Sequence, residues 1–313
     1  MSERLPPLTA LRAFEATARH MSFARAADEL HVTPAALSFQ IKSLEEHLGQ
    51  PVFRRLNRAV ELTELGAMLA PGLRTGFQDI GTAWTKARRF TDQSLLTITA
   101  GPAFTALWLA PRMFSFATKH PDIELRFAAS LKVADFDRDD VDIAIRFGQG
   151  GDEGLFSQVL LEDWMTPMMS PELAKDIINP EDLLNVTLIH DDVTAFLRPP
   201  VDWAAWFTSM GVTPPEMHGP RFNLGEHAIG AAIAGVGAIM GRISLTSAAL
   251  SDGRLVMPFR ETMKSGASYR LVCPEGTESR PHVAAFIDWI EGEIRDFDSF
   301  HKGRIFIPVP ATR

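Results

Sequence analysis

The chain has 313 residues, of which 46% are apolar and 22% charged, and its formal net charge is −8. This length is enough for two or three packed domains, and the apolar content excludes a disordered chain. The longest apolar stretch, residues 228–241, contains four glycines and falls short of the ~20 residues that a membrane helix needs. The N-terminal segment lacks an export-signal pattern, and Cys273, the only cysteine, cannot form an internal disulfide; both features predict a cytoplasmic location.

The charge is distributed unevenly along the chain. Residues 1–90 contain 12 Lys and Arg against 9 Asp and Glu, a formal +3, whereas residues 91–313 contain 19 against 30, a formal −11. Arg54, Arg55 and Arg58 cluster in the first part, where they can neutralise phosphates locally. The alternative is that these arginines only solvate a surface loop.

Residues 22–31 predict a short helix that ends near His31. Ser22 suits an N-cap, and the apolar residues of the segment recur at i, i+3, i+4 and i+7. These residues are Phe23, Ala26, Ala27 and Leu30. An earlier amphipathic segment, residues 8–19, offers Leu8, Leu11, Phe14 and Ala18 to the same small core.

A second helix follows after a tight turn. Thr33 and Pro34 predict an N-cap and a first helical residue, and Gly49 closes the helix. Its inward stripe consists of Leu37, Ile41, Leu44 and Leu48. Residues 49–63, GQPVFRRLNRAVELT, contain two short β-type runs around an Asn-Arg turn, which indicates a wing. The whole is a winged helix-turn-helix.

The stretch from LPPLTALRAFEATARH through SFARAADELHVTPAALSFQIKSLEEHLGQPVFRR to LTELG resembles the N-terminal domain of LysR-type transcriptional regulators. The resemblance is greatest to the branch that contains the glycine-cleavage activator and the β-lactamase regulator AmpR. It implies DNA contacts from the second helix and from the wing, and Phe39 departs from the Arg or His of many relatives. The implied residues are Thr33, Ala35, Ser38, Phe39, Gln40, Lys42, Arg54, Arg55 and Arg58. Gln40 can pair with adenine through two hydrogen bonds, and an alanine or aromatic side chain can contact a thymine methyl group.

An apolar stripe then continues to residue 88. It consists of Leu62, Leu65, Leu69, Leu73, Phe77, Ile80 and Trp84, which predicts a long helix with one buried seam. The seam can pack on its own domain or on a second copy, and the family resemblance implies dimerisation through this helix. Pro71 and Gly72 are expected to allow a kink. Two copies imply a partly palindromic operator.

From about residue 93, β-type runs alternate with helical stretches, which predicts parallel α/β units. Together with the resemblance, this gives a two-lobed effector domain like the periplasmic binding proteins. The predicted boundaries are 1–60 for the winged helix-turn-helix, 61–90 for the linker helix, 91–301 for the effector domain and 302–313 for an unassigned tail. Lobe I takes about 91–162 and 268–301, and lobe II about 163–267.

A two-lobed α/β body binds its ligand between the lobes, where strands end and helices begin. The residues predicted on this rule and from the resemblance are Ala103, Thr105, Arg146, Gly148, Phe196, Asn223, Gly225, His227 and Tyr269. Each has a structural alternative, such as an interlobe ion pair for Arg146 or a surface position for His227. The planar fork of an arginine suits a carboxylate, so Arg146 hints at a small acid or amino acid. Ala103 and Gly225 replace hydroxyl residues of AmpR, which argues against a muropeptide-like ligand.

An enzyme is the main alternative class. The segment His190-Asp191-Asp192 and Cys273 carry reactive groups, but neither comes with a second element that would complete a triad or a metal site. The expected protein is therefore no enzyme and uses no cofactor or metal. Its expected partners are promoter DNA, a small-molecule effector and further copies of itself, as a dimer or tetramer; contact with RNA polymerase stays open. A second alternative is a cytoplasmic sensor whose DNA-binding domain no longer functions.

Overall fold

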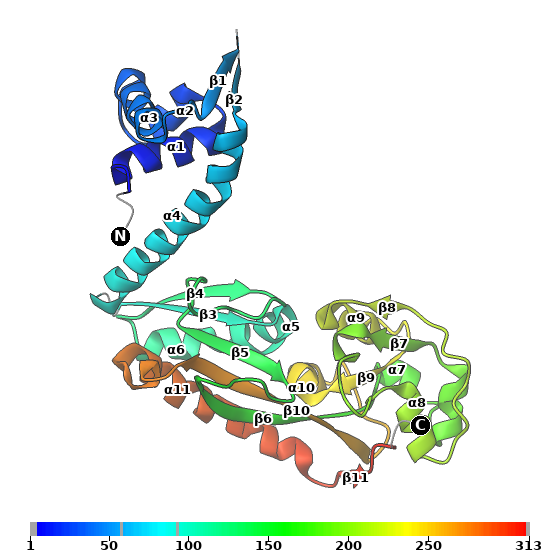
Figure 1. Ribbon diagram of the computed structural model, residues 1–313. Coiled ribbons are helices and arrows are strands. Elements are labelled where there is room, and N and C mark those ends of the chain that lie inside the picture. Colours follow the sequence, from blue (N-terminus) through cyan, green and yellow to red (C-terminus); the bar gives the residue numbers. More distant parts are fainter. Residues whose placement is uncertain (1–4, 57–58, 92–93, 311–313) are drawn as a thin grey trace. The chain divides into compact units, whose positions relative to one another are not determined.

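The computed structural model describes residues 5–56, 59–91 and 94–310. The chain divides into two compact units, Met1–Arg88 and Arg89–Arg313. Within the described residues, no helix combines the length and apolar content that crossing a membrane requires. The predicted fold class is confirmed: an α-rich winged helix-turn-helix, a long helix and a two-lobed α/β domain (Figure 1).

The N-terminal unit contains three helices, a two-stranded wing and the start of a long helix. The elements are α1 (Leu8–His20), α2 (Phe23–Glu29), α3 (Pro34–Leu48), β1 (Phe53–Leu56), β2 (Ala59–Leu62) and α4 (Glu64–Thr91). The predicted caps are present. The amide N–H of Arg25 donates to Ser22 Oγ at 3.4 Å, and that of Ala36 donates to Thr33 Oγ1 at 3.2 Å. Gly49 ends α3 with φ +70°, a left-handed conformation that glycine adopts without a steric penalty.

The core of this unit forms where the three helices meet. Ala26 and Ala27 are fully buried, so α2 lies close to its neighbours, and Phe14 and Phe53 pack with ring centroids 5.3 Å apart. Two apolar residues predicted in this core are exposed instead: Leu8 at 61% and Leu48 at 39%. They are the first residue of α1 and the last residue of α3, beyond the reach of the neighbouring helices.

The wing pairs β1 with β2 in antiparallel register, with Arg54 opposite Glu61. The predicted turn at Asn57 and Arg58 lies outside the described residues. Two hydrogen bonds fix the ends of the wing, one to α3 and one between the two segments that flank its strands. Glu45 Oε1 accepts from the amide N–H of Val52 at 2.9 Å, and Thr63 Oγ1 donates to the carbonyl of Pro51 at 2.9 Å.

Helix α4 extends over 28 residues and continues through Pro71. Its apolar stripe has two parts. The first part, Leu65, Leu69, Leu73 and Phe77, is half-buried against the core of the N-terminal unit. The second part, Ile80 and Trp84, is 57% and 67% exposed. The alternative of packing on the same domain therefore applies only to the first half of the stripe.

The second unit is built on one mixed sheet with the strand order β4-β3-β5-β10-β6-β9-β7-β8, and β11 pairs with β10. The strands are β3 (Leu95–Ala100), β4 (Glu124–Ala129), β5 (Ile143–Gly148), β6 (Leu155–Met168), β7 (Leu188–Asp191), β8 (Arg221–Phe222), β9 (Ala238–Arg242), β10 (Glu261–Pro274) and β11 (Ile305–Ile307). The α-helices are α5 (Pro102–Phe104), α6 (Met113–Lys119), α7 (Pro171–Ala174), α8 (Trp203–Ser209), α9 (Gly225–Ile233), α10 (Ile243–Ser251) and α11 (Pro281–Ile294). The strands β3, β4 and β5 are parallel in one lobe, and β7, β8 and β9 are parallel in the other.

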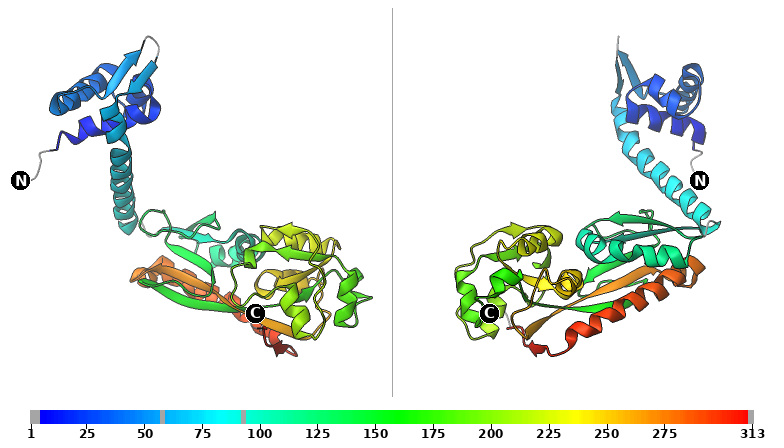
Figure 2. Two further views of the ribbon diagram at one scale, coloured as in Figure 1. Left: turned by 45° about the vertical axis from the view of Figure 1, so that its right-hand side comes forward. Right: turned by 180° about the vertical axis from the view of Figure 1, so that it is seen from behind.

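Strands β6 and β10 run antiparallel from one lobe into the other (Figure 2). Each has 14 residues, and the first half of β6 largely alternates between half-buried and exposed positions. The tail, which the sequence leaves unassigned, contributes β11, with Ile305 in register with Glu261.

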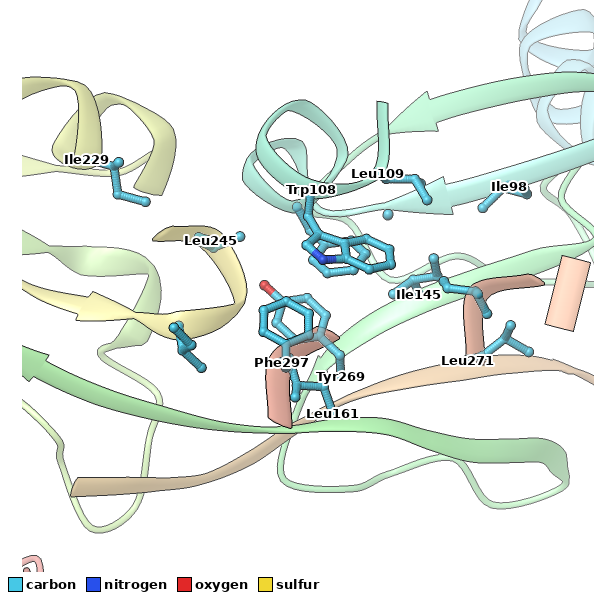
Figure 3. Packing of buried hydrophobic residues seen from close by; sticks show 14 of the residues in the cluster. Ile98, Trp108, Leu109, Ile145, Leu161, Ile229, Leu245, Tyr269, Leu271 and Phe297 are labelled. Atoms are coloured by element: carbon cyan, nitrogen blue, oxygen red, sulfur yellow. The ribbon is translucent and has the colours of Figure 1, made fainter. Parts of the chain in front are cut away.

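Aromatic side chains fill the core of this unit beside the junction of the lobes. The ring of Phe104 stacks on Tyr269 with centroids 4.3 Å apart and on Trp108 at 4.9 Å, and Trp108 stacks on Phe297 at 6.0 Å. Figure 3 shows Tyr269 among these apolar side chains, with its hydroxyl directed towards Leu245 of α10. One side of the junction is therefore filled with stacked aromatic rings, and the Tyr269 hydroxyl lies at its edge.

Candidate functional site

The outer face of α3 carries several of the predicted DNA contacts. Thr33 caps the helix, Ala35 is exposed, and Phe39 is 69% exposed and so does not pack beneath the wing. The Lys42 side chain is 75% exposed, and its Nζ lies 3.8 Å from Glu46, a distance that leaves the ammonium group accessible. This face therefore presents apolar groups and one cation.

Two of the predicted contacts are less accessible. Gln40 and Ser38 are half-buried, and Gln40 Oε1 accepts a hydrogen bond from Thr9 Oγ1 at 3.1 Å. This bond ties the carbonyl half of the amide to α1. The amide oxygen can accept a second hydrogen bond, so the bond from Thr9 restrains the side chain without preventing its pairing with adenine, a restraint that the sequence does not reveal.

The predicted arginines lie in or beside the wing. Arg54 is exposed on β1, and Arg55 is its neighbour in the same strand. Arg58 lies outside the described residues.

An ion-pair cluster joins α1 to α2, the first helix of the helix-turn-helix. Arg19 Nη2 lies 2.6 Å from Glu29 Oε1, Arg19 Nε lies 3.0 Å from Glu15 Oε1, and His20 Nε2 lies 2.5 Å from Glu29 Oε2. The hydrogen bond from Arg19, followed by that from His20, lowers the pKa of Glu29 to about 2. The carboxylate is thus ionised at any physiological pH.

A cavity of about 530 Å³ lies in the second unit at the ends of β3 and β5, between the two lobes. Most of the predicted effector residues line it: Ala103, Arg146, Gly148, Phe196, Asn223, Gly225 and Tyr269. Two of them do not. Thr105 is half-buried and donates its hydroxyl hydrogen bond to the Gly101 carbonyl at 3.0 Å, and His227 is exposed on α9.

Arg146 does not offer a free fork to a ligand. Its Nη1 lies 3.2 Å from Asp152 Oδ1, and its Nη2 donates to the carbonyl of Ala134 at 3.0 Å. Asp152 also accepts from Arg270 Nε at 2.5 Å and from Ser157 Oγ at 2.9 Å. Burial alone would raise the pKa of Asp152, but these hydrogen bonds hold the pKa below its ordinary value. The predicted carboxylate-binding group is therefore part of an internal ion-pair cluster.

A different arginine, Arg242, is buried in the wall of the same cavity. The residue is 4% exposed and is the last residue of β9. Its Nη2 lies 3.5 Å from Asp191 Oδ2, its Nη1 lies 3.4 Å from the hydroxyl of Tyr269, and its guanidinium lies over the ring of Phe147 at 4.7 Å. Its Nε has no hydrogen-bond partner within the part of the chain that the structure describes. Arg242 therefore retains one unused donor, and so does Arg146, whose Nε is also buried without a hydrogen-bond partner among the described residues.

Acidic and phenolic groups surround this guanidinium. Asp163 is completely buried, and burial raises its pKa, although Ser244 donates to Asp163 Oδ2 at 2.7 Å. Burial likewise raises the pKa of Tyr269 to about 12, so its hydroxyl stays protonated. Burial thus disfavours the ionised forms of Asp163 and Tyr269 beside a permanent cation.

The groups that an enzyme would use have structural roles. Asp191 pairs with Arg242, and its Oδ1 accepts from the amide N–H of Val193 at 3.1 Å. Cys273 is fully buried, and burial raises its pKa to about 12, which leaves it as an unreactive thiol.

Sequence reasoning missed Arg242, Asp152, Arg270 and Glu226, all of which line the cavity. A signal exists only for Arg242, a single charged residue that directly follows the apolar run of β9. Asp152 and Arg270 meet across 118 residues of sequence, and no local pattern marks such a pair.

Comparison with known proteins agrees with this architecture. Residues 8–67 match the family model described as "Bacterial regulatory helix-turn-helix protein, lysR family", and residues 91–295 match the model described as "LysR substrate binding domain". The chain therefore belongs to the LysR family of DNA-binding transcriptional regulators, which are not enzymes.

Among its relatives, the glycine cleavage system transcriptional activator of Escherichia coli (strain K12) is 39% identical over 93% of this chain and 94% of that protein. The transcriptional activator AmpR of Rhodobacter capsulatus is 34% identical over 92% of this chain and 97% of that protein. The solved AmpR effector binding domain from Citrobacter freundii has a TM-score of 0.55 at 25% identity and covers 65% of this chain and 99% of that one. The structure of CrgA from Neisseria meningitidis, at 22% identity, has a TM-score of 0.53 and covers 93% of this chain and 99% of that one, which supports the fold.

Proposed function

We propose that this regulator binds a partly palindromic promoter site in the cytoplasm as a dimer or tetramer, and that a small molecule in the interlobe cavity controls it. Two features of the same chain support this proposal: the first unit has an exposed α3 face, and the second has a cavity lined by predicted effector residues. The domain boundaries inferred from the sequence, 1–60, 61–90 and 91–301, with lobes that meet near residues 162 and 268, are part of the proposal.

The DNA-binding part of the proposal assigns α3 to the major groove and the wing to the DNA backbone. Phe39 is placed to contact thymine methyl groups, and Lys42 and Arg54 to contact phosphates. The acidic second part of the chain does not oppose this, because a charge acts over a Debye length of only ~8 Å at physiological salt.

Self-association through α4 follows from its exposed apolar residues. Ile80 and Trp84, four residues apart on one face of α4, are 57% and 67% exposed, and a second copy of α4 would bury such a surface. Two copies would place two α3 helices in successive major grooves. A nuclease footprint on the DNA beside the gene should then show two protected half-sites about 10 base pairs, or a multiple of this, apart. A single protected half-site would contradict the dimer.

The effector part of the proposal is a small acid or amino acid that binds one arrangement of the lobes more tightly than the other. Contacts between lobes already exist beside the cavity: Gln149 Nε2 donates to the carbonyl of Arg198 at 2.8 Å, and the rings of Phe147 and Phe196 lie 5.8 Å apart. A ligand shifts such an equilibrium only by its difference in affinity for the two states. The footprint repeated with candidate acids and amino acids tests the coupling.

The competing function, a sensor whose DNA-binding domain is inactive, is disfavoured by the accessible cation of Lys42 and by the intact caps of α2 and α3. A chain that binds no promoter DNA with or without effector would favour that sensor.

A further inference from the structure

The cavity wall formed by Arg242 and the start of α9 has the features of an anion site. Arg242 is 4% exposed with its Nε unpaired, as far as the described residues extend. Helix α9 begins at Gly225, the side chain of its N-cap residue Leu224 makes no capping hydrogen bond, and both residues line the cavity. The first N–H groups of a helix have no acceptor within the helix and carry a partial positive charge. A buried guanidinium and a helix N-terminus therefore meet at one point of the wall.

Glycine at position 225 allows this close approach. A Cβ atom at Gly225 would lie 3.1 Å from Arg242 Nη2 and 3.2 Å from Asp191 Oδ2, tighter than ordinary contacts. Without a side chain, the backbone of the first helical turn can share an oxyanion with the guanidinium, as in other helix N-terminal anion sites.

An unpaired acceptor lies one residue further along α9. Glu226 lines the same cavity, and its Oε2 is buried without a hydrogen-bond partner among the described residues. A buried carboxylate oxygen without a donor costs free energy, and a ligand cation would remove that cost.

The two unused groups are opposite in charge and belong to residues that line the same cavity. A plain anion would satisfy Arg242 but would add a negative charge beside Asp191 and Glu226. A zwitterion satisfies both groups and adds no net charge to a buried site. A ligand whose two charges are close together suits this wall, because Gly225, whose backbone lies against Arg242, is followed directly by Glu226.

The remaining wall is apolar. Phe104 and Tyr269 are stacked beside the site, the rings of Phe147 and Phe196 are in edge contact in the same wall, and Leu131 and Val133 are exposed apolar residues that also line the cavity. Such a wall suits an apolar side chain on the ligand.

We propose that the effector is an α-amino acid with an apolar side chain, bound through its carboxylate by Arg242 and the N-terminus of α9 and through its ammonium group by Glu226. The inference rests on the proposed function of this cavity as the effector site. It names a class of ligand and the two residues that distinguish this class from plain carboxylates and plain amines.

Calorimetry on the full-length chain without DNA tests the proposal. The ligands are leucine and phenylalanine, each as both enantiomers, with 3-phenylpropanoate and 2-phenylethylamine as analogues that lack one charged group each. We expect at least one enantiomer of an amino acid to bind, and the two analogues to bind about tenfold or more weakly, because each loses one charge-assisted hydrogen-bonded contact.

Variants assign the two ends of the ligand. Glu226→Gln should weaken amino-acid binding about tenfold while the affinity for 3-phenylpropanoate does not fall, because only the ammonium contact is lost. Arg242→Lys should weaken both ligands, since a lysine cannot provide the fork. Glu172→Gln, a change on the exposed surface of α7, is the matched control and should alter neither. Circular dichroism checks that each variant is folded, and Glu226→Gln carries the test if Arg242→Lys fails to fold.

Each contrary result has a distinct meaning. Equal binding of 3-phenylpropanoate and phenylalanine would overturn the ammonium site, and equal binding of 2-phenylethylamine would overturn the anion site. No binding of any panel member by a preparation that binds promoter DNA would overturn the amino-acid proposal and leave the DNA-binding function standing. Failure to bind DNA in the parallel assay would count against the proposed function instead.

Discussion

Asp152 holds two arginines beside the interlobe cavity, and its removal provides a quantitative test of that cluster. Its side chain is 8% exposed, as is that of Arg270, and the side chain of Arg146 is 16% exposed. Asp152→Ala leaves two largely buried guanidinium groups without their carboxylate. Removing one partner of a buried ion pair costs about 3–5 kcal/mol. At a urea dependence of about 3 kcal/mol per molar, the unfolding midpoint of this unit should fall by about 1–1.7 M.

Tryptophan fluorescence in urea follows this unit specifically, because five of the six tryptophans belong to it: Trp108, Trp164, Trp203, Trp206 and Trp289. Asp252→Ala is the matched control, since the Asp252 side chain is 60% exposed and its pair with Arg254 lies at the surface. Its free energy of unfolding should change by less than about 0.5 kcal/mol.

The effect of Asp152→Ala should also depend on pH in a defined way. The folded state lowers the pKa of Asp152, so its ionisation contributes stability that is present above its unfolded pKa of about 4 and is lost as the pH falls through the lower folded value. The difference between wild type and Asp152→Ala should therefore shrink in acid. If the midpoints of Asp152→Ala and Asp252→Ala shift equally at neutral pH, the cluster contributes nothing and the reasoning is refuted.

Three further predictions concern other parts of the chain. Gly66→Ala should destabilise the N-terminal unit by at least about 2 kcal/mol, because a Cβ there would lie 2.2 Å from the carbonyl oxygen of Val52. Gly72→Ala on the same helix meets no atom within 4 Å and should not destabilise it. Thermal unfolding of the two variants compares them. Cys273 should resist alkylation in the native protein and react once the chain is unfolded in urea, since burial raises its pKa to about 12; labelling of the folded chain within minutes would contradict this. Glu29→Gln should destabilise the N-terminal unit at pH 7. The difference in free energy of unfolding from wild type should diminish between pH 4.5 and about 2, because the contribution of a lowered carboxyl pKa is lost in acid. A constant difference across that range would argue against the ion-pair cluster.

The helix-turn-helix could be predicted from sequence because its signals are local. Ser22, Thr33 with Pro34, and Gly49 each mark a helix end within a few residues, and capping chemistry fixes what such residues do. The exposure of Leu8 and Leu48 could not be predicted, because it depends on where the neighbouring helices end.

The cavity was predicted less completely, because its contacts join residues that are far apart in the sequence. Its position followed from the rule that ligands bind where strands end in α/β folds, and glycines such as Gly148 and Gly225 marked two of those ends. The state of its charges depends on residues far apart in sequence. Arg146 was expected to face a ligand but is engaged by Asp152. Arg242, at the end of β9, is recognised as a candidate from its position beside the Tyr269 hydroxyl.

The affinity of the chain for the DNA beside its own gene should be measured first, by fluorescence anisotropy over a range of salt concentrations. It tests the central claim, that α3 and the wing bind DNA locally although the chain as a whole is acidic. Lys42→Ala should weaken binding and lower the salt dependence by about one phosphate contact. Lys302→Ala, which removes an exposed lysine from the second unit, should leave both unchanged. Equal effects of the two substitutions, or an affinity that does not fall as salt rises, would contradict the account.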